Sequence, residues 1–359
     1  MGGPVEVVGR PARLVMGVVA ASVLTVTLLA WAKWMPYAAK VPGLAASHGW
    51  AGADVLRAGG VQPGDAPSWS AATSFTWAYG KAVWRALLAA LLISAALQTL
   101  IPKTWLVRVL NRPGRLRSAM AGGLAGTPSM MCACCTAPVA VGLKRRGVST
   151  AAVVAYWLGN PLLNPAVLVF LLLVAPWQRT ATRLVVGVLV VVGGAALVSW
   201  LADGRAPAAA AASTASAASA AEDADDPPPS VRRYLSVLLR SSVILLPEYL
   251  VVVMLIGAFR GWLFPLGEGS GLLVVLVAAL VGTALVIPTA GEIPIAQGLA
   301  LAGLSLGGVG ALLVTLPAVS LPGMIMVGKA FGWRVTVATA AVAAAGGIAA
   351  AGLLPLLSA

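Results

Sequence analysis

The residues with the clearest potential for chemistry are five sulfur-containing side chains that stand within six consecutive positions. They include all three cysteines of the protein and are Met130, Met131, Cys132, Cys134 and Cys135. Thiolate and thioether sulfur atoms are soft ligands, which suit thiophilic species such as Cu(I), Zn(II) or a trivalent arsenical. The pattern predicts a substrate or metal site with the three cysteines as ligands and the two methionines as weaker candidates.

A packing role is the alternative for this cluster, because small cysteine side chains also fill tight helix crossings. The density of sulfur favours ligation over packing. Cys132 and Cys134 form the predicted pair, since an extended turn points alternate residues the same way. Pro138 suits the start of the helix that follows, so the thiols are expected at a helix break.

The composition identifies the setting of this site as a membrane. The chain is 60% hydrophobic, only 10% charged, and has a mean hydropathy of +0.94. Long apolar runs at this frequency indicate an all-α polytopic membrane protein. The net charge of +13 comes from basic residues in short loops between apolar runs, as the positive-inside rule expects, and not from a nucleic-acid-binding face.

The N-terminal part, residues 1–80, is predicted to be one transmembrane helix followed by an outer loop. The apolar run of residues 14–31 is longer than the core of a typical signal peptide. Arg10 and Arg13 hold its N-terminus inside. Residues 36–80 form the loop, in which His48 is expected to be an ordinary surface residue.

The rest of the chain divides into a first membrane repeat (81–202), a linker (203–233) and a second membrane repeat (234–359). The linker is rich in Ala and Ser and then in acidic residues and Pro, which predicts a disordered cytoplasmic segment. Eight apolar segments are expected in the two repeats. They are residues 82–101, 118–143, 150–175, 182–201, 235–259, 271–304, 307–327 and 336–357.

The repeats are indicated when the sequence is aligned with itself after a shift of 156 residues, an alignment that needs no gap. It takes Pro138 to Pro294, Pro161 to Pro317 and Trp177 to Trp333. Internal repeats with segments that Gly and Pro interrupt at matching positions are typical of secondary transporters and mark their binding sites.

Charge favours an inverted relation between the repeats. The broken segment 118–143 either crosses the membrane or re-enters it as a hairpin. A hairpin leaves the basic residues 144–146 on the same inner side as the basic loop 103–117, which agrees better with the positive-inside rule. The second half then starts from the opposite side, and the two hairpin tips meet near the midplane. A fully crossing arrangement with parallel repeats is the alternative.

Two asparagines follow the cysteines in the sequence AYWLGNPLLNPAV. Asn160 and Asn164 each precede a proline, and the two prolines are expected to break the helix and to leave both amides on one face. We predict that they contact the substrate; the alternative is that they satisfy backbone groups freed by the break. The predicted hinges and helix breaks are Pro138, Pro161, Pro165, Pro294 and Pro317.

Two acidic residues lie inside predicted membrane segments, where ionisable groups are usually functional. Glu292 stands at the tip of the second broken segment, and Glu248 follows Pro247. Both are candidates for proton coupling, and Glu292 is also a candidate ligand. For Glu248 an ion pair with Arg240 or another basic residue is an equal alternative.

Two stretches resemble a known family, the ArsP-type permeases. They are PSMMCACCTAPVAVGLKRRGVSTAAVVAYWLGNPLLNPAV (128–167) and GEIPIAQGLALAGLSLGGVGALLVTLPAVSLP (291–322). The resemblance implies an inner-membrane efflux permease for trivalent organoarsenicals or soft metal ions. Cys132 and Cys134 occupy the positions of the family's paired cysteines. Cys135 departs from the commoner pattern, in which Gly follows, and a third thiol suits a three-coordinate centre.

The sequence predicts a secondary-active permease of the cell membrane rather than an enzyme, because it contains no nucleotide-binding loop and no catalytic triad or zinc-protease pattern. No cofactor and no nucleic-acid partner are expected. The partners are a small thiophilic substrate and the lipid bilayer, and a homo-oligomer is compatible with the sequence. The alternative function is a membrane thiol protein for redox relay or metal delivery.

Overall fold

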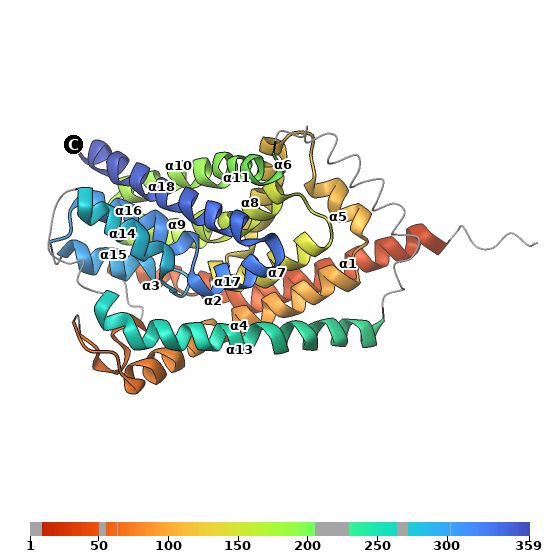
Figure 1. Ribbon diagram of the computed structural model, residues 1–359, viewed down its shortest axis with the longest axis horizontal. Coiled ribbons are helices and arrows are strands. Elements are labelled where there is room, and N and C mark those ends of the chain that lie inside the picture. The colour runs from red at the N-terminus through yellow and green to blue at the C-terminus, as the bar shows by residue number, and fades with distance from the viewer. Residues whose placement is uncertain (1–8, 50–54, 63, 205–229, 264–271, 302) are drawn as a thin grey trace, which may run out of the picture.

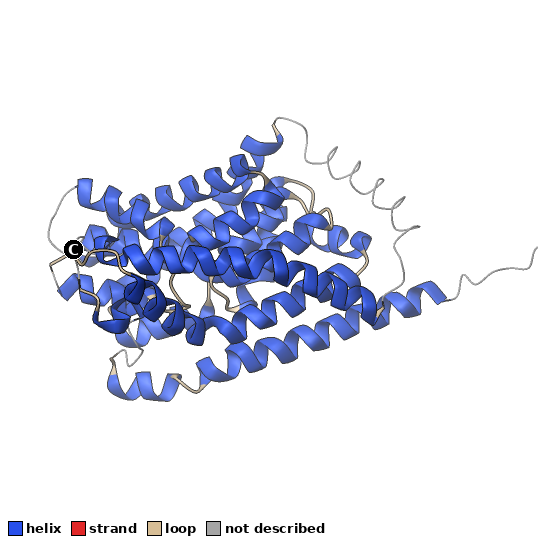
Figure 2. Cartoon of the chain, turned by 60° about the horizontal axis from the view of Figure 1, so that its bottom comes forward, coloured by secondary structure: helices blue, strands red, loops and turns tan. Residues whose placement is uncertain are grey.

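The computed structural model describes residues 9–49, 55–62, 64–204, 230–263, 272–301 and 303–359. Every regular element within these ranges is helical, as Figure 2 shows. Six of the described helices are long and apolar enough to cross a membrane, or seven if one bent pair counts as a single span. The bent pair joins α16 (Leu306–Ala318) and α17 (Leu321–Phe331) at an angle of 50°. These features confirm an all-helical polytopic membrane protein.

The N-terminal helix is longer than the sequence predicts. It comprises α1 (Gly9–Leu29), the π-helical turn η1 (Ala30–Trp34), α2 (Met35–Ala38) and α3 (Val41–Ser47). Pro36 and Pro42 stand in the first turns of α2 and α3, where the missing N–H group of a proline costs nothing. The first part of the predicted loop, residues 36–47, is therefore mostly helical.

Helix α4 (Trp69–Thr99) also begins inside the predicted loop, after the short turn η2 (Val55–Gly60). Ser68 starts it as an N-cap, because its side chain accepts a hydrogen bond from the N–H group of Ala71 at 3.1 Å. His48 is exposed at the C-terminal end of α3. Figure 1 shows α1, α4 and α13 (Val231–Leu263) side by side along one face of the molecule.

The remaining described elements of the first half follow α4 along the chain. They are α5 (Lys103–Leu110), α6 (Arg115–Gly126), η3 (Thr127–Ser129), α7 (Ala133–Arg145), α8 (Thr150–Leu162), α9 (Pro165–Val174), α10 (Trp177–Val188), η4 (Leu189–Gly194) and α11 (Ala195–Asp203). The second half contains α13, α14 (Leu272–Ala284), α15 (Glu292–Leu301), α16, α17 and α18 (Trp333–Ser358). Most of the predicted linker, residues 205–229, lies outside the described residues.

Helices α6 and α7 form a hairpin whose two outer ends lie together. A Cβ atom on Gly122 would overlap the backbone of Ala152, and one on Gly126 would overlap that of Tyr156. Since both residue numbers rise together, α6 and α8 run parallel, and α7, which connects them in the chain, must run in the opposite direction. Asn111, just before α6, binds the loop after α7: its amide donates to the Gly147 carbonyl oxygen at 3.2 Å.

Helix positions in the two halves agree in spacing. Helices α8, α9 and α10 begin at residues 150, 165 and 177, while α16, α17 and α18 begin at 306, 321 and 333. Ser149 and Ser305 are the N-caps of α8 and α16. Helix α18 packs against α10, η4 and α11 in the opposite direction, because Gly194 lies against Val342 and Gly346 lies against Val190.

Candidate functional site

The cysteine cluster is formed by the N-terminal end of α7. The chain leaves η3 through Met130, whose φ of 53° lies in the left-handed region, and Cys132 then adopts an extended backbone as the N-cap of α7. Cys134 and Cys135 occupy the first turn. An N-cap side chain folds back over the second and third residues of its helix, so this local geometry brings the three sulfur atoms together.

The three sulfur atoms lie within 4.8 Å of one another and are buried. The Sγ atom of Cys132 is 3.1 Å from that of Cys134 and 2.9 Å from that of Cys135, while Cys134 and Cys135 are 4.0 Å apart. Cys132 is therefore the common member of two close pairs. Among the described residues, no other His, Cys, Asp or Glu side chain joins the cluster. Three thiols at these distances can bind one soft ion.

Helix α7 begins before Pro138, so the predicted helix start at this proline is wrong. The extended backbone of Cys132 sets the start instead, and Pro138 lies inside the helix. Its carbonyl oxygen accepts a hydrogen bond from Ser94 of α4 at 2.7 Å. Of the two methionines, Met131 is buried and Met130 is half-buried.

Two tyrosines from other helices contact Cys134. The hydroxyl oxygen of Tyr79, in α4, is 3.1 Å from the Cys134 sulfur, and that of Tyr249, in α13, is 3.6 Å from it. Both tyrosines are buried. They hold the Cys134 thiol from α4 and α13, and sequence reasoning did not find them.

A second helix break lies across a small cavity from the cysteines. It is formed by residues 285–291 between α14 and α15, and Ala290 within it has a φ of 70°. The cavity has a free volume of about 10 Å³, enough for one water molecule or ion. It is lined by Cys132, Ala133, Cys134, Pro161, Ile287, Pro288, Thr289, Glu292, Leu316, Pro317 and Ser320. Both predicted broken segments thus contribute to one cavity.

Lys33 reaches the same region from the N-terminal helix. Its ammonium group donates to the hydroxyl oxygen of Tyr37 at 3.0 Å and to Oγ1 of Thr289 at 2.9 Å. Thr289 lines the cavity together with Cys132 and Cys134, so Lys33 lies one hydrogen bond from the cavity wall. Sequence reasoning missed Lys33, which stands between Trp31 and Trp34 and resembles an interfacial anchor.

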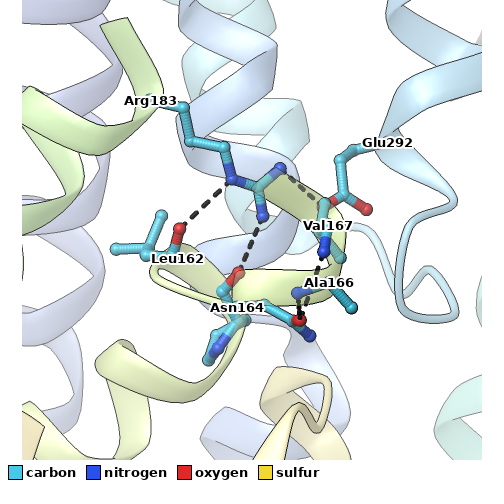
Figure 3. Close-up of polar contacts among 7 residues, drawn as sticks. Leu162, Asn164, Ala166, Val167, Arg183 and Glu292 are labelled. Atoms are coloured by element: carbon cyan, nitrogen blue, oxygen red, sulfur yellow. Dashed lines mark hydrogen bonds and ion pairs between the residues drawn. The ribbon is translucent and has the colours of Figure 1, made fainter. Parts of the chain in front are cut away.

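Glu292, at the start of α15, forms an ion pair with Arg183 of α10. Nη1 of Arg183 is 2.7 Å from Oε1 of Glu292, and the two side chains are 0% and 2% exposed. Arg183 also donates to the carbonyl oxygens of Pro161 at 2.7 Å and Leu162 at 3.2 Å, and Figure 3 shows its guanidinium between α8 and Glu292. The Pro161 carbonyl needs this donor, because Pro165 has no N–H group to offer it.

The two asparagines are fully buried but do not share a helix face. Asn160 lies in α8, where its amide donates to the Tyr156 carbonyl oxygen at 2.9 Å and accepts from Ser129. Asn164 is the N-cap of α9 and accepts from the N–H groups of Ala166 and Val167. The expectation of a shared face is wrong, because α8 ends at Leu162 and Asn164 takes an extended backbone as the N-cap of the next helix. A role in substrate contact stays a prediction.

Glu248 lies away from the cavity and pairs with Lys329 rather than with Arg240. Its Oε1 atom is 2.8 Å from Nζ of Lys329, whose side chain is 61% exposed. This pair joins α13 to α17.

The predicted hinge prolines take two kinds of position. Pro161 and Pro317 stand in the last turns of α8 and α16, just before each helix breaks. Pro165 and Pro294 stand in the first turns of α9 and α15. Prolines at these positions mark the ends of the broken helices and leave carbonyl groups in need of donors.

A polytopic helical fold with two helix breaks that line one small cavity is the architecture expected of a membrane transport protein, and the comparisons with known proteins agree. Residues 68–353 match the ArsP_1 family of predicted permeases, and the chain belongs to this family. It is also 37% identical over 327 residues to the UPF0718 protein YraQ of Escherichia coli (strain K12), a match that covers 90% of each chain. No solved structure matches the chain.

Proposed function

We propose that this permease is a secondary-active exporter of the cell membrane that moves a thiophilic substrate, a trivalent organoarsenical or a soft metal ion, out of the cell. The observation that carries the proposal is the cluster of three buried thiols at a helix break, across one cavity from a second break. Helix breaks at membrane depth are tolerated where they line a cavity, and transporters place substrates there.

The proposal includes two inverted repeats that each contain a re-entrant hairpin. The agreement of helix starts after a shift of 156 residues supports the repeat, since it carries α8 to α16, α9 to α17 and α10 to α18. The opposite directions of α10 and α18 support the inversion. The contact of Asn111 with Gly147 supports the hairpin, because it joins the entry of α6 to the exit of α7.

The experiment that tests the function is uptake into everted membrane vesicles. Methylarsenite, Cu(I) and Zn(II) are supplied with and without a proton gradient, and vesicles that lack the protein give the background. An exporter accumulates at least one of them in the energised vesicles. Thiol redox turnover or metal transfer to a carrier protein, without accumulation, would instead support the alternative function.

The topology gives a testable prediction. Residues 144–146 and the linker are expected to face the cytoplasm, because the hairpin returns the chain to the side from which it entered. In a variant without native cysteines, Arg145→Cys and Ser216→Cys should resist an impermeant thiol reagent added to intact cells. Both should react after the cells are opened.

Ser47→Cys provides the matched control, since Ser47 is exposed at the far end of the first span and should react in intact cells. Labelling of Arg145→Cys from outside would refute the re-entrant hairpin and with it the inverted repeats.

Proton coupling by Glu292 is a further part of the proposal. Thiols release protons when they bind a metal ion, and a carboxylate that lines the same cavity can accept them when its ion pair with Arg183 opens during transport. Glu292→Gln is expected to bind substrate normally and to transport it with a much weaker dependence on pH. Substrate affinity and vesicle uptake between pH 6 and 8 measure the two effects; a normal pH profile would remove Glu292 from coupling.

A further inference from the structure

Lys33 is a buried cation that, among the described residues, forms hydrogen bonds to uncharged groups alone. It is 5% exposed, and its ammonium group contacts the hydroxyl groups of Tyr37 and Thr289. None of the described carboxylates pairs with it. The nearest one to the cavity, Glu292, is already neutralised by Arg183. A buried charge without a counter-ion is costly. The ammonium group of Lys33 would therefore be stabilised by one negative charge placed near it.

The groups able to supply that charge are the thiols. Thr289, the hydrogen-bond partner of Lys33, lines the cavity together with Cys132 and Cys134. The N-terminal helix, which lies outside the residues that match the family, thus places a positive charge one hydrogen bond from the wall of the cavity that the thiols line.

Possible substrates differ in the charge of their thiolate complexes. Cu(I) displaces two protons from two thiols and gives a complex of charge −1; Zn(II) displaces three protons from three thiols and also gives −1. Methylarsenite condenses with two thiols, forms two As–S bonds and releases two waters, and its complex is neutral. Only the metal complexes complement a single ammonium group.

We propose that Lys33 is a specificity-determining residue that makes the cysteine site prefer thiophilic metal cations, whose thiolate complexes carry one negative charge, over trivalent arsenicals. The proposal rests on the proposed function and narrows its substrate class. Ser320 adds a further donor for such a site, because its buried hydroxyl group lines the cavity and has no hydrogen-bond partner among the described residues.

The test compares the binding of Cu(I) and phenylarsine oxide to the purified full-length protein. Cu(I) affinity is measured by competition with a chromogenic chelator, and arsenic binding by equilibrium dialysis. Lys33→Gln is expected to weaken Cu(I) binding by about 10- to 100-fold, since it removes a unit charge next to the complex. The affinity for phenylarsine oxide should change by less than about threefold, because a neutral complex gains little from the charge.

Lys33→Arg should retain most of the Cu(I) affinity, and Lys81→Gln, which removes an exposed lysine of α4, should change neither ligand. Retained arsenical binding also shows that the Lys33→Gln protein is folded. If the Lys33→Gln protein does not fold, Lys33→Met is used in its place. An equal loss for both ligands, or no loss, would overturn the proposal. So would a wild-type protein that exports the arsenical but not Cu(I), whatever the variants do.

A failure of the proposed role of Lys33 is distinguishable from a failure of the proposed function. If the cysteines are not the site, Cys132→Ser with Cys134→Ser leaves Cu(I) and arsenical binding unchanged. If they are the site but Lys33 does not select the substrate, the double cysteine variant loses both ligands while Lys33→Gln keeps its wild-type preference.

Discussion

Replacing Cys132 and Cys134 together with Ser is expected to abolish export of the thiophilic substrate. The two sulfur atoms are 3.1 Å apart, buried, and directed into one cluster. A serine hydroxyl is a hard, neutral ligand that does not replace a thiolate for a soft ion. Loss of supporting residues around a metal typically costs about 10- to 100-fold in affinity, so loss of two ligands should cost at least about 100-fold. Cellular accumulation of methylarsenite, Cu and Zn measures the effect.

Cys135→Ser is the matched comparison, because it leaves the Cys132–Cys134 pair in place. A substrate held by two thiols should still be exported by this variant, whereas a three-coordinate substrate should not. Both variants are compared at equal amounts in the membrane. Wild-type export of all three substrates by the double variant would disprove the assignment of the cysteines as the site.

The sequence was sufficient to predict the parts of this protein that local composition determines. Hydropathy identified the helical membrane fold, and the family resemblance carried by the Cys132–Asn164 region is confirmed by the match over residues 68–353. The cysteine cluster was predictable because its three members come from one turn. Its detailed geometry was not: the sequence favoured Cys132 and Cys134 as the closest pair of the three, whereas the N-cap position of Cys132 brings Cys135 equally close.

The groups that surround the cysteines could not be predicted in the same way, because each comes from a distant helix. Tyr79, Tyr249 and Lys33 stand in apolar runs where an aromatic ring or a lysine is ordinary. Arg183 falls near the edge of an apolar segment, so it resembles a flanking charge until Glu292 is brought next to it. Tertiary packing creates these pairs, and hydrophobic periodicity carries no information about which helices meet.

Breaking the ion pair between Arg183 and Glu292 is expected to destabilise the fold strongly. Arg183→Met leaves the Glu292 carboxylate buried without its partner and removes the donor to the Pro161 and Leu162 carbonyl oxygens. Removal of one partner from a buried pair costs about 3–5 kcal/mol. Glu292→Gln should lower the free energy of unfolding by less, because the amide oxygen of the new side chain can still accept a hydrogen bond from Arg183. The apparent Tm of the purified protein in detergent ranks the variants.

The double variant Arg183→Met with Glu292→Met tests whether the loss comes from the stranded charge. It should be more stable than Arg183→Met alone, since no carboxylate is then left buried. The departure of its effect from the sum of the two single-variant effects gives the coupling free energy between Arg183 and Glu292. Arg179→Met is the control on the same helix. Arg179 is half-buried and forms no ion pair with a described residue, so its replacement should lower the free energy of unfolding by less than about 1 kcal/mol. If Arg183→Met melts no lower than Arg179→Met, the pair does not stabilise the break. The junction of α8, α10 and α15 must then depend on apolar packing alone.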